Sequence, residues 1–252
     1  MNYQTPDIVA VILAGGFGTR VRHILPNIPK PMAQVADKPF IDWIIRYLAQ
    51  QKLENFIVST GYLGEIIEDY FEQNSLLNTQ IKCYQEKEVL GTGGGFVYAV
   101  NQSQKYPLAW LVTNGDSLIF TDLQPLFNYL KDDTVEGVIL GLASDDASRY
   151  GSLTYDSDYN LVEFAEKKVG AGVINAGVYL LKNTLLKKFP QQKPLSFEND
   201  IFPQLLAQKC LIKVHIVSAP FLDIGTPESL AKAEIFIRAN STDKRVNSKI
   251  CD

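Results

Sequence analysis

The stretch VILAGGFGTRVRHILPNIPKPM, residues 11–32, decides the fold. It begins inside a continuous apolar run over residues 8–13, which is typical of a buried parallel strand. Three of the four residues after Ala14 are glycine. A strand, a glycine-rich turn and a following helix place backbone N–H groups at the carboxyl edge of an α/β sheet, where such folds bind phosphates.

Basic side chains come next in this stretch. Arg20 and Arg22 follow the glycines at once, and Lys30 stands between Pro29 and Pro31. Because the two prolines restrict the backbone, we expect the Lys30 ammonium to be held in position. Backbone donors, a guanidinium that can make two parallel hydrogen bonds and a compact ammonium together suit a triphosphate. The alternative is a solvent-exposed loop with scattered charge.

Two common phosphate-binding motifs are excluded. The dinucleotide fingerprint is G-x-G-x-x-G. If Gly16 and Gly18 are its first two glycines, the sixth position of the motif falls on Val21, which is not glycine. The P-loop pattern G-x-x-x-x-G-K-[ST] occurs nowhere in the chain. The failed fingerprint argues against a nicotinamide oxidoreductase.

The rest of the chain predicts an α/β fold with a doubly wound, mixed but mainly parallel sheet. In the first 120 residues, strands alternate with helices, as such a sheet requires. The expected strands are 8–13, 56–60, 81–84 and 109–113. The expected helices are 39–50, 64–73 and one after the glycine loop 91–95. Closely spaced strands then suggest antiparallel additions, at 135–143, 151–155, 161–165 and 172–181, followed by helices 197–208 and 227–238. We expect one domain over residues 1–240 and a polar tail over 241–252.

Composition limits the class of protein. With 252 residues, 46% hydrophobic and 21% charged, the chain is an ordinary globular sequence. No apolar run approaches a membrane span, and the amino terminus lacks the basic segment of a signal peptide, so we expect a cytoplasmic protein with no membrane partner. Cys83, Cys210 and Cys251 lie far apart, which fits reduced thiols. A net charge of −4 gives no sign of a nucleic-acid partner.

The segments LAGGFGTRVR and PKPM closely resemble the signature of the sugar-1-phosphate nucleotidyltransferases, and later segments match in order. These enzymes join a nucleoside triphosphate to a sugar 1-phosphate and release pyrophosphate. The resemblance implies a Rossmann-like nucleotidyltransferase fold, with a nucleotide-binding half over 1–120 and a sugar-binding half over 121–240. It nominates as nucleotide-binding the loop residues Leu13, Ala14, Gly15, Gly16, Gly18, Thr19, Arg20, Gly91 and Thr92.

Two aspartates are candidates for a metal site. Asp116 follows the buried strand 109–113, so it lies at the same sheet edge as the glycine loop, although a turn-capping role is a common alternative. The resemblance implies that Asp116 and Asp223, in FLDIGTPESL, bind Mg²⁺. Two carboxylates suffice, because Mg²⁺ takes phosphate oxygens and waters as its other ligands.

Three later residues are nominated for the sugar phosphate. Glu166 and Lys167 match a Glu-Lys pair that the family uses for sugar hydroxyls and for the sugar phosphate, although Lys168 stands where relatives often have proline. A surface charge cluster is the alternative. The strand INAGVYLL resembles a sugar-contacting strand and nominates Asn175, while a strand with a bulge at Gly177 is the plain alternative.

The base is expected to be read near YQEKEVLGTGGG, residues 84–95. Relatives that use uridine or thymidine commonly place Gln five residues before the glycine turn, where this chain has Glu86 before Gly91. A carboxylate only accepts hydrogen bonds, and it could take the N1–H and the 2-amino group of guanine together. This favours GTP, although Gln85 is an alternative register. The segment GTGGG also resembles uridylyltransferases for N-acetylmuramate 1-phosphate, so uridine stays open.

LGTGGG, PKPMA, RYGS and SFENDI as a set look most like the D-glycero-α-D-manno-heptose 1-phosphate guanylyltransferases, which would supply nucleotide sugar for lipopolysaccharide, capsule or S-layer glycans. A mannose-1-phosphate guanylyltransferase and a catalytically silent regulatory subunit are the alternatives, and the oligomeric state, a homodimer included, is left open. No general base is needed, because a phosphate ester is already a nucleophile above about pH 6. We assign Arg20 and Lys30 to the triphosphate, Asp116 to Mg²⁺ and Lys167 to the incoming phosphate as the catalytic set.

Overall fold

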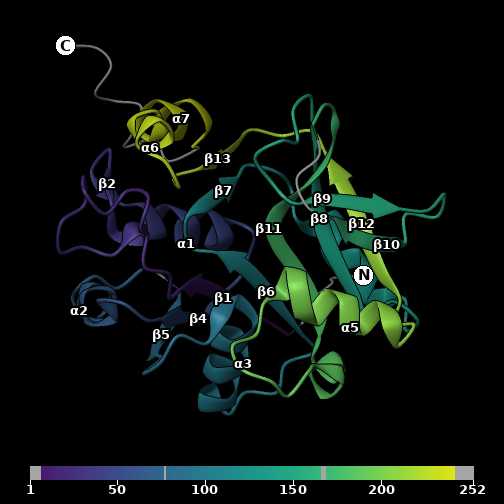
Figure 1. Ribbon diagram of the computed structural model, residues 1–252. Helices are drawn as coiled ribbons and strands as arrows, with labels where there is room; N and C mark the ends of the chain where they lie inside the picture. The colour runs from purple at the N-terminus through teal and green to yellow at the C-terminus, as the bar shows by residue number, and fades with distance from the viewer. Residues whose placement is uncertain (1–6, 77, 166–168, 242–252) are drawn as a thin grey trace.

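The computed structural model describes residues 7–76, 78–165 and 169–241 (Figure 1). Its centre is a nine-stranded sheet in which β10, β9, β11, β6, β1, β4 and β5 follow one another, while β8 pairs with β11 and β12. The strands of this sheet are β1 Ile8–Ala14, β4 Asn55–Thr60, β5 Gln80–Gln85, β6 Ala109–Asn114, β8 Gly137–Ser144, β9 Ser152–Tyr155, β10 Leu161–Ala165, β11 Gly172–Lys182 and β12 Ile212–Val217. The predicted α/β class with a mixed, mainly parallel core and later antiparallel strands is confirmed.

The parallel part of the sheet is formed by the first half of the chain. β1 lies between β4 and β6, and β4 pairs with β5, all in parallel. Every residue of β1 from Val9 to Ile12 is buried, because helices cover both faces. Alternate residues of β1 face the core under α1 (Phe40–Gln50) and the core under α3 (Gly91–Ser103). A continuous apolar strand is the pattern that this two-sided burial requires.

The second half adds antiparallel strands. β11 pairs antiparallel with β6, and β8 and β9 pair antiparallel with β11. A later strand, β12, runs parallel to β8 at the edge. Two small sheets flank the centre: β2 Gln34–Val35 with β3 Lys38–Pro39, and β7 Ser117–Ile119 with β13 Phe221–Asp223.

Helix boundaries correct several sequence-based expectations. The glycine loop is followed by turns and the short 3-10 helix Lys30–Met32, and α1 begins only at Phe40, after Pro39. The glycines at 91–95 lie inside α3, which begins at Gly91. The expected helix over 197–208 is a π-helical turn, Phe197–Ile201, followed by α5, Phe202–Ala207. The remaining helices are α2 Gly64–Gln73, α4 Gln124–Asn128, α6 Pro227–Ala231 and α7 Ala233–Asn240, with 3-10 turns at Tyr129–Lys131 and Asn183–Lys188.

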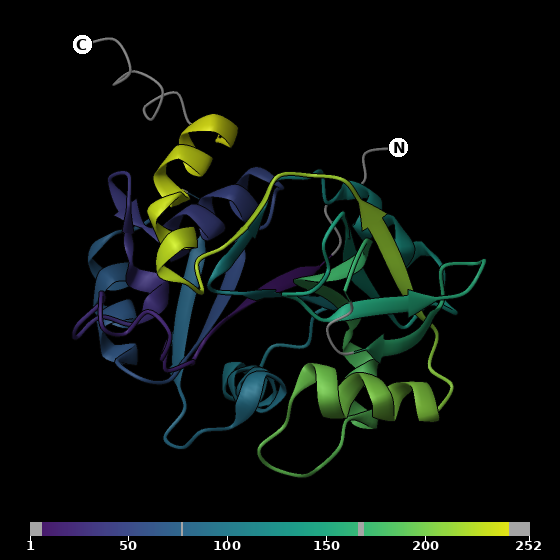
Figure 2. The same ribbon diagram turned by 45° about the horizontal axis from the view of Figure 1, so that its top comes forward.

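The chain returns to its first half at the end. After β12, the segment with β13 crosses back, and α6 and α7 lie beside the amino-terminal hairpin of β2 and β3 (Figures 1 and 2). This return brings Asp223 of β13 next to β7, which follows β6 directly. Within the described part of the chain, no helix is long and apolar enough to cross a membrane.

Some predictions fall on residues outside the described ranges. Glu166, Lys167 and Lys168 lie there, and so does the tail from residue 242. Their assigned roles stay predictions from the resemblance.

Candidate active site

A pocket of about 270 Å³ opens at the carboxyl ends of the parallel strands. Its walls come from the loop after β1, from β4 and β6, and from the first turn of α3. The lining residues are Leu13, Gly15, Gly16, Phe17, Ser59, Glu86, Val89, Gly91, Thr92, Gly95, Asn114 and Asp116. Seven of the twelve were nominated from the sequence: Leu13, Gly15, Gly16, Glu86, Gly91, Thr92 and Asp116. The sheet edge therefore gathers residues that are up to about a hundred positions apart in the chain.

The glycine loop is shaped by close contacts with its neighbours. Gly18 has a φ of +58°, and a β-carbon there would lie 3.1 Å from the β-carbon of Lys30. Gly115 meets the loop from the next strand: its N–H donates to the Leu13 carbonyl at 2.8 Å, and a β-carbon would lie 2.8 Å from that oxygen. A residue with a β-carbon would be strained at Gly18 because of the positive φ, and at Gly115 because the β-carbon would meet a backbone oxygen.

Lys30 and Asp116 form an ion pair between Lys30 Nζ and Asp116 Oδ2. Both side chains are largely shielded from solvent, at 14% and 26% exposure. Lys30 begins its 3-10 turn directly after Pro29, whose backbone is extended, as the flanking prolines led us to expect. The second carboxylate oxygen, Asp116 Oδ1, accepts a hydrogen bond from Ser117 Oγ at 3.1 Å. The lysine is thus held at the carboxyl edge of the sheet, with its charge directed at the candidate metal residue.

Asp223 lies beside Asp116. Its partner across the β7–β13 pair is Ser117, and the N–H of Ile224 donates to the Asp116 carbonyl at 2.9 Å. Burial raises the pKa of the Asp223 carboxyl, and the negative charge of Asp116 raises it further. The N–H of Gly225 donates to Asp223 Oδ1 at 2.8 Å and opposes this rise, as do the charges of Lys30 and Arg20.

Two converging carboxylates that repel each other are suited to a shared divalent cation. Mg²⁺ binds through one or two carboxylates and completes its coordination with phosphate oxygens and water. The described residues contain no cluster of three or more His, Cys, Asp or Glu side chains able to hold a metal. Asp116 and Asp223 therefore fit a cation that arrives with a phosphate ligand better than a resident structural metal.

Glu86 lines the pocket and is enclosed by glycines. A β-carbon at Gly15 or Gly61 would lie 3.0 Å from Glu86 Oε1, and one at Gly95 would lie 3.3 Å from Oε2. Burial raises the pKa of the Glu86 carboxyl to about 7, although a hydrogen bond from the backbone of Leu90 opposes the rise. The three glycines make room for one side chain, and that side chain is an acceptor near the middle of its titration at neutral pH.

The alternative register at Gln85 is less suited to reading a base. Its Nε2 donates to the Gly61 carbonyl at 3.1 Å and to Glu65 Oε2 at 3.2 Å. Glu86 lines the pocket and Gln85 does not.

The first turn of α3 is occupied by protein contacts. The N–H groups of Gly93 and Gly94 donate to the Leu195 carbonyl at 2.8 and 3.0 Å. Gly91 has a φ of +77°, and a β-carbon there would lie 2.6 Å from the same oxygen. The glycines at 91, 93 and 94 thus allow the segment at Leu195 to dock. Gly95 alone of this run faces the carboxylate of Glu86.

Asn175 lies on β11 at an irregular point. The register of β11 against β8 shifts between Asn175 and Tyr179, and Gly177 in the bulge has a φ of +71°. Asn175 Oδ1 accepts a hydrogen bond from the Gly177 N–H at 2.9 Å, and Asn175 Nδ2 donates to Tyr179 Oη at 2.7 Å. A β-carbon at Gly177 would lie 2.5 Å from the side chain of Asn114, which lines the pocket. The bulge at Gly177 is therefore present, and the sugar contact of Asn175 stays a prediction.

The remaining nominated residues that the structure describes do not line the pocket. Ala14 is buried in the core, and Thr19 and Arg20 are exposed. The Arg20 charge nevertheless acts on Asp223 and on Tyr150, where it lowers the pKa. His23 is exposed and does not line this pocket.

Sequence reasoning missed several residues of this region. Tyr150, quoted only within RYGS, has a pKa raised first by burial and then by the charge of Asp223, with a smaller contribution from Asp116. Phe17 and Val89 are exposed apolar side chains in the pocket wall. Their signal in the sequence was weak, because an isolated apolar residue in a loop has many explanations.

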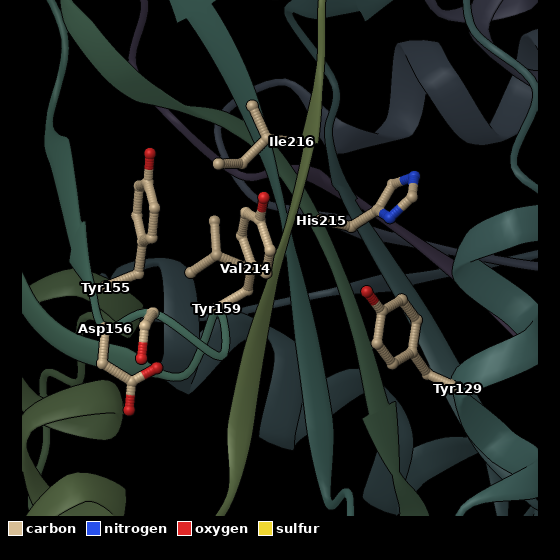
Figure 3. Close-up of a pocket in the computed structure, with 8 residues that line it drawn as sticks. Tyr129, Tyr155, Asp156, Tyr159, Val214, His215 and Ile216 are labelled. Carbon is tan, nitrogen blue, oxygen red and sulfur yellow. The ribbon is translucent and has the colours of Figure 1, made fainter.

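A larger pocket of about 490 Å³ lies at the edge strand β12 and contains no nominated residue. Figure 3 shows Tyr155 and Tyr159 on one side of this strand and His215 and Tyr129 on the other. The rings of Tyr155 and Tyr159 stack at 5.7 Å. The one carboxylate in the lining, Asp156, is already used, since it accepts hydrogen bonds from the N–H groups of residues 158 and 160. Converging charges distinguish the smaller pocket as the candidate site.

Comparison with known proteins agrees with this geometry. The model of the nucleotidyl transferase family matches residues 9–240. D-glycero-α-D-manno-heptose 1-phosphate guanylyltransferase from Campylobacter jejuni is 36% identical over 87% of this chain and 95% of its own length. Mannose-1-phosphate guanylyltransferase from Mycobacterium tuberculosis is 31% identical over 90% of this chain and 64% of its own length.

Solved structures extend the likeness to three dimensions. HddC from Yersinia pseudotuberculosis superimposes with a TM-score of 0.80 at 34% identity, over 90% of this chain and 97% of that one. HddC has also been solved in complex with GMP-PN, with a TM-score of 0.78 to this chain. The matched segment includes the glycine loop, Lys30 and both aspartates, and the chain belongs to the nucleotidyl transferase family.

Proposed function

We propose that this protein transfers GMP from GTP to D-glycero-α-D-manno-heptose 1-phosphate, giving a GDP-sugar and pyrophosphate. The observation that carries the choice of base is the carboxylate of Glu86 inside the pocket, enclosed by three glycines. Guanine presents two adjacent donors to such an acceptor, whereas uracil or thymine would set a carbonyl against it. The names of the relatives from Campylobacter and Yersinia support the same base and, for the former, the same sugar.

The residues suit an in-line displacement at the α-phosphorus. The sugar phosphate attacks as its own nucleophile, because the second ionisation of a phosphate ester lies near about pH 6. Lys30, at the edge of the pocket, and Arg20 neutralise the triphosphate as pyrophosphate leaves, and the glycine loop orients it through backbone N–H groups. Mg²⁺, held by Asp116 and Asp223, would supply further charge neutralisation. Glu166 and Lys167 are proposed for the sugar and its phosphate, together with Asn175.

Mannose 1-phosphate is the second candidate acceptor. It is supported by the 31% identity to a mannose-1-phosphate guanylyltransferase, and the two sugars share a manno configuration. A catalytically silent subunit is disfavoured, because Lys30, Asp116 and Asp223 are all present and lie together. We also propose that the product serves cell-surface polysaccharide synthesis from the cytoplasm.

Pyrophosphate release with Mg²⁺ tests the proposal. GTP, UTP, CTP, dTTP and ATP are compared with heptose 1-phosphate as acceptor, and then mannose, glucose and N-acetylmuramate 1-phosphates are compared with the preferred nucleotide. We expect strong preference for GTP and for the heptose. Preference for UTP with N-acetylmuramate 1-phosphate would overturn the base and the sugar, and no release with any pair would overturn the enzymatic function.

A further inference from the structure

One carboxylate outside the nominated set joins the two sides of the candidate site. Glu198 lies in the π-helical turn Phe197–Ile201, far from the glycine loop in sequence. Its Oε2 accepts hydrogen bonds from Ser196 Oγ at 2.9 Å and from Thr92 Oγ1 at 3.4 Å. Its Oε1 accepts a hydrogen bond from Tyr179 Oη at 3.3 Å. Three hydroxyl donors therefore converge on one side chain.

Tyr179 connects Glu198 by hydrogen bonds to Asn175, the residue nominated for the sugar. This tyrosine is fully buried, and its ring packs 5.1 Å from the rings of both Phe197 and Phe202. Tyr179 Oη accepts a hydrogen bond from Asn175 Nδ2 at 2.7 Å and donates to Glu198. The direction of each hydrogen bond in this series is set by Glu198, because an ionised carboxylate can only accept.

Thr92 connects Glu198 by a hydrogen bond to the first turn of α3, which carries residues nominated for the nucleotide. Its Oγ1 donates to Glu198 and accepts a hydrogen bond from the Phe197 N–H at 3.1 Å. Thr92 stands in the first turn of α3 and lines the pocket with Gly91. The Leu195 carbonyl, three residues before Glu198, accepts from two N–H groups of the same turn. The segment 195–198 therefore holds the nucleotide-side turn by its backbone and by one carboxylate.

We propose that Glu198 is a positioning residue for both substrates: through Tyr179 it orients the amide of Asn175 toward the sugar 1-phosphate, and through Thr92 it fixes the turn that borders the nucleotide. This inference rests on the proposed nucleotidyl transfer and adds a residue that serves both ligands at once. Asn175 is the intermediary on one side only, so the two connections can be separated by mutation.

The test compares Glu198→Gln, Tyr179→Phe and their double variant. Glu198→Gln keeps the shape but puts an NH₂ donor against hydroxyls, so we expect KM to rise about tenfold or more for the sugar 1-phosphate and also to rise for the nucleotide. Tyr179→Phe keeps the buried ring and removes only the hydroxyl, so KM should rise for the sugar 1-phosphate alone. The double variant should resemble Glu198→Gln, since the two residues act in one series.

Asp200→Asn is the matched control. Asp200 is a carboxylate in the same turn, and its oxygens accept hydrogen bonds from the Ser196 N–H and from Gln192 Nε2 instead of from Tyr179 or Thr92. It should leave both KM values near those of the unmodified protein, whereas a general loss of packing would move all variants alike.

The measurements use whichever nucleotide and sugar 1-phosphate the unmodified protein turns over. Absence of turnover with every pair would therefore count against the proposed function, while in an active protein the KM values of the variants test Glu198 separately. Unchanged KM values in Glu198→Gln would overturn the inference. If Glu198→Gln does not fold, Tyr179→Phe decides: an unchanged KM for the sugar 1-phosphate would also overturn it.

Discussion

Replacing Glu86 by glutamine is the sharpest test of base reading. Glutamine has nearly the same size, but one of its two acceptor oxygens becomes an NH₂ donor. In the structure the carboxylate is surrounded by Gly15, Gly61 and Gly95, so no neighbouring side chain from these positions can substitute for it. We predict that Glu86→Gln loses most of the preference for guanine over hypoxanthine, which lacks the 2-amino group.

The expected preference for GTP over ITP follows from one hydrogen bond to a charged group, and the expected pH dependence of the KM for GTP follows from the titration of Glu86. A hydrogen bond to an ionised group contributes about 1.5–3 kcal/mol, so GTP should be preferred over ITP by about 10- to 150-fold in the unmodified protein. Only the ionised form of Glu86 accepts both donors. With a pKa of about 7, the carboxyl is ionised to about nine-tenths at pH 8 and about one-tenth at pH 6. The KM for GTP should therefore rise about tenfold as the pH falls across this range.

The assay is steady-state pyrophosphate release at saturating sugar 1-phosphate, with KM for GTP and ITP measured between pH 6 and pH 8. The triphosphate and the sugar phosphate also titrate here, but they do so equally with both proteins. The pH dependence of the ratio between the KM for GTP of Glu86→Gln and that of the unmodified protein therefore reports the titration of the Glu86 carboxyl alone. Gln85→Ala serves as the control for the alternative register and should keep the GTP preference. If Glu86→Gln discriminates GTP from ITP as before, and the KM ratio does not change with pH, another group reads the base.

Three further outcomes are expected. Lys30→Ala or Asp223→Ala should lower turnover by orders of magnitude while far-UV circular dichroism stays native, because Lys30→Ala removes a positive charge proposed to neutralise the triphosphate and Asp223→Ala removes a proposed Mg²⁺ ligand; near-normal turnover would refute their roles. Removing Mg²⁺ with a chelator should abolish turnover, and added Mg²⁺ should restore it; activity that persists in the chelator would argue against a metal. Gly91→Ala should lower the free energy of unfolding in urea by about 1–3 kcal/mol, because its φ is +77° and its β-carbon would meet the Leu195 carbonyl. Gly16→Ala, with no atom within 4 Å of the new carbon, should leave stability unchanged, and equal losses would contradict the steric argument.

Much of the fold could be predicted because the apolar pattern of each short segment agrees with the place that the segment takes in the folded core. The strands near residues 56–60 and 109–113 were evident as short apolar runs stopped by Gly61 and by Asn114-Gly115, and the helix over 64–73 has the predicted bounds. Errors arose where tertiary contacts override local preference. Five residues of glycine and threonine at 91–95 read as a loop, yet they start α3, because the Leu195 carbonyl caps two of their N–H groups.

The site could be predicted only where its residues stand next to an element boundary. The glycine loop, Asp116 and Glu86 all follow a strand, and parallel strands end at one edge. Glu198 has no such signal, because a single Glu in a helical segment is most often a surface residue. Its importance is visible only when β11 and α3 are seen to approach it from two sides.

The sequence by itself determined the fold class, the glycine loop and the identity of the charged side chains, because apolar periodicity, glycine and proline act over a few neighbouring residues. The tertiary structure alone decided which of those charges meet. Asp223 reaches Asp116 because β13 crosses back to pair with β7, and Glu86 acquires its raised pKa because three glycines from separate segments close around it. These contacts join residues that are distant in the chain. The pattern of residue types within a short stretch of sequence does not specify them.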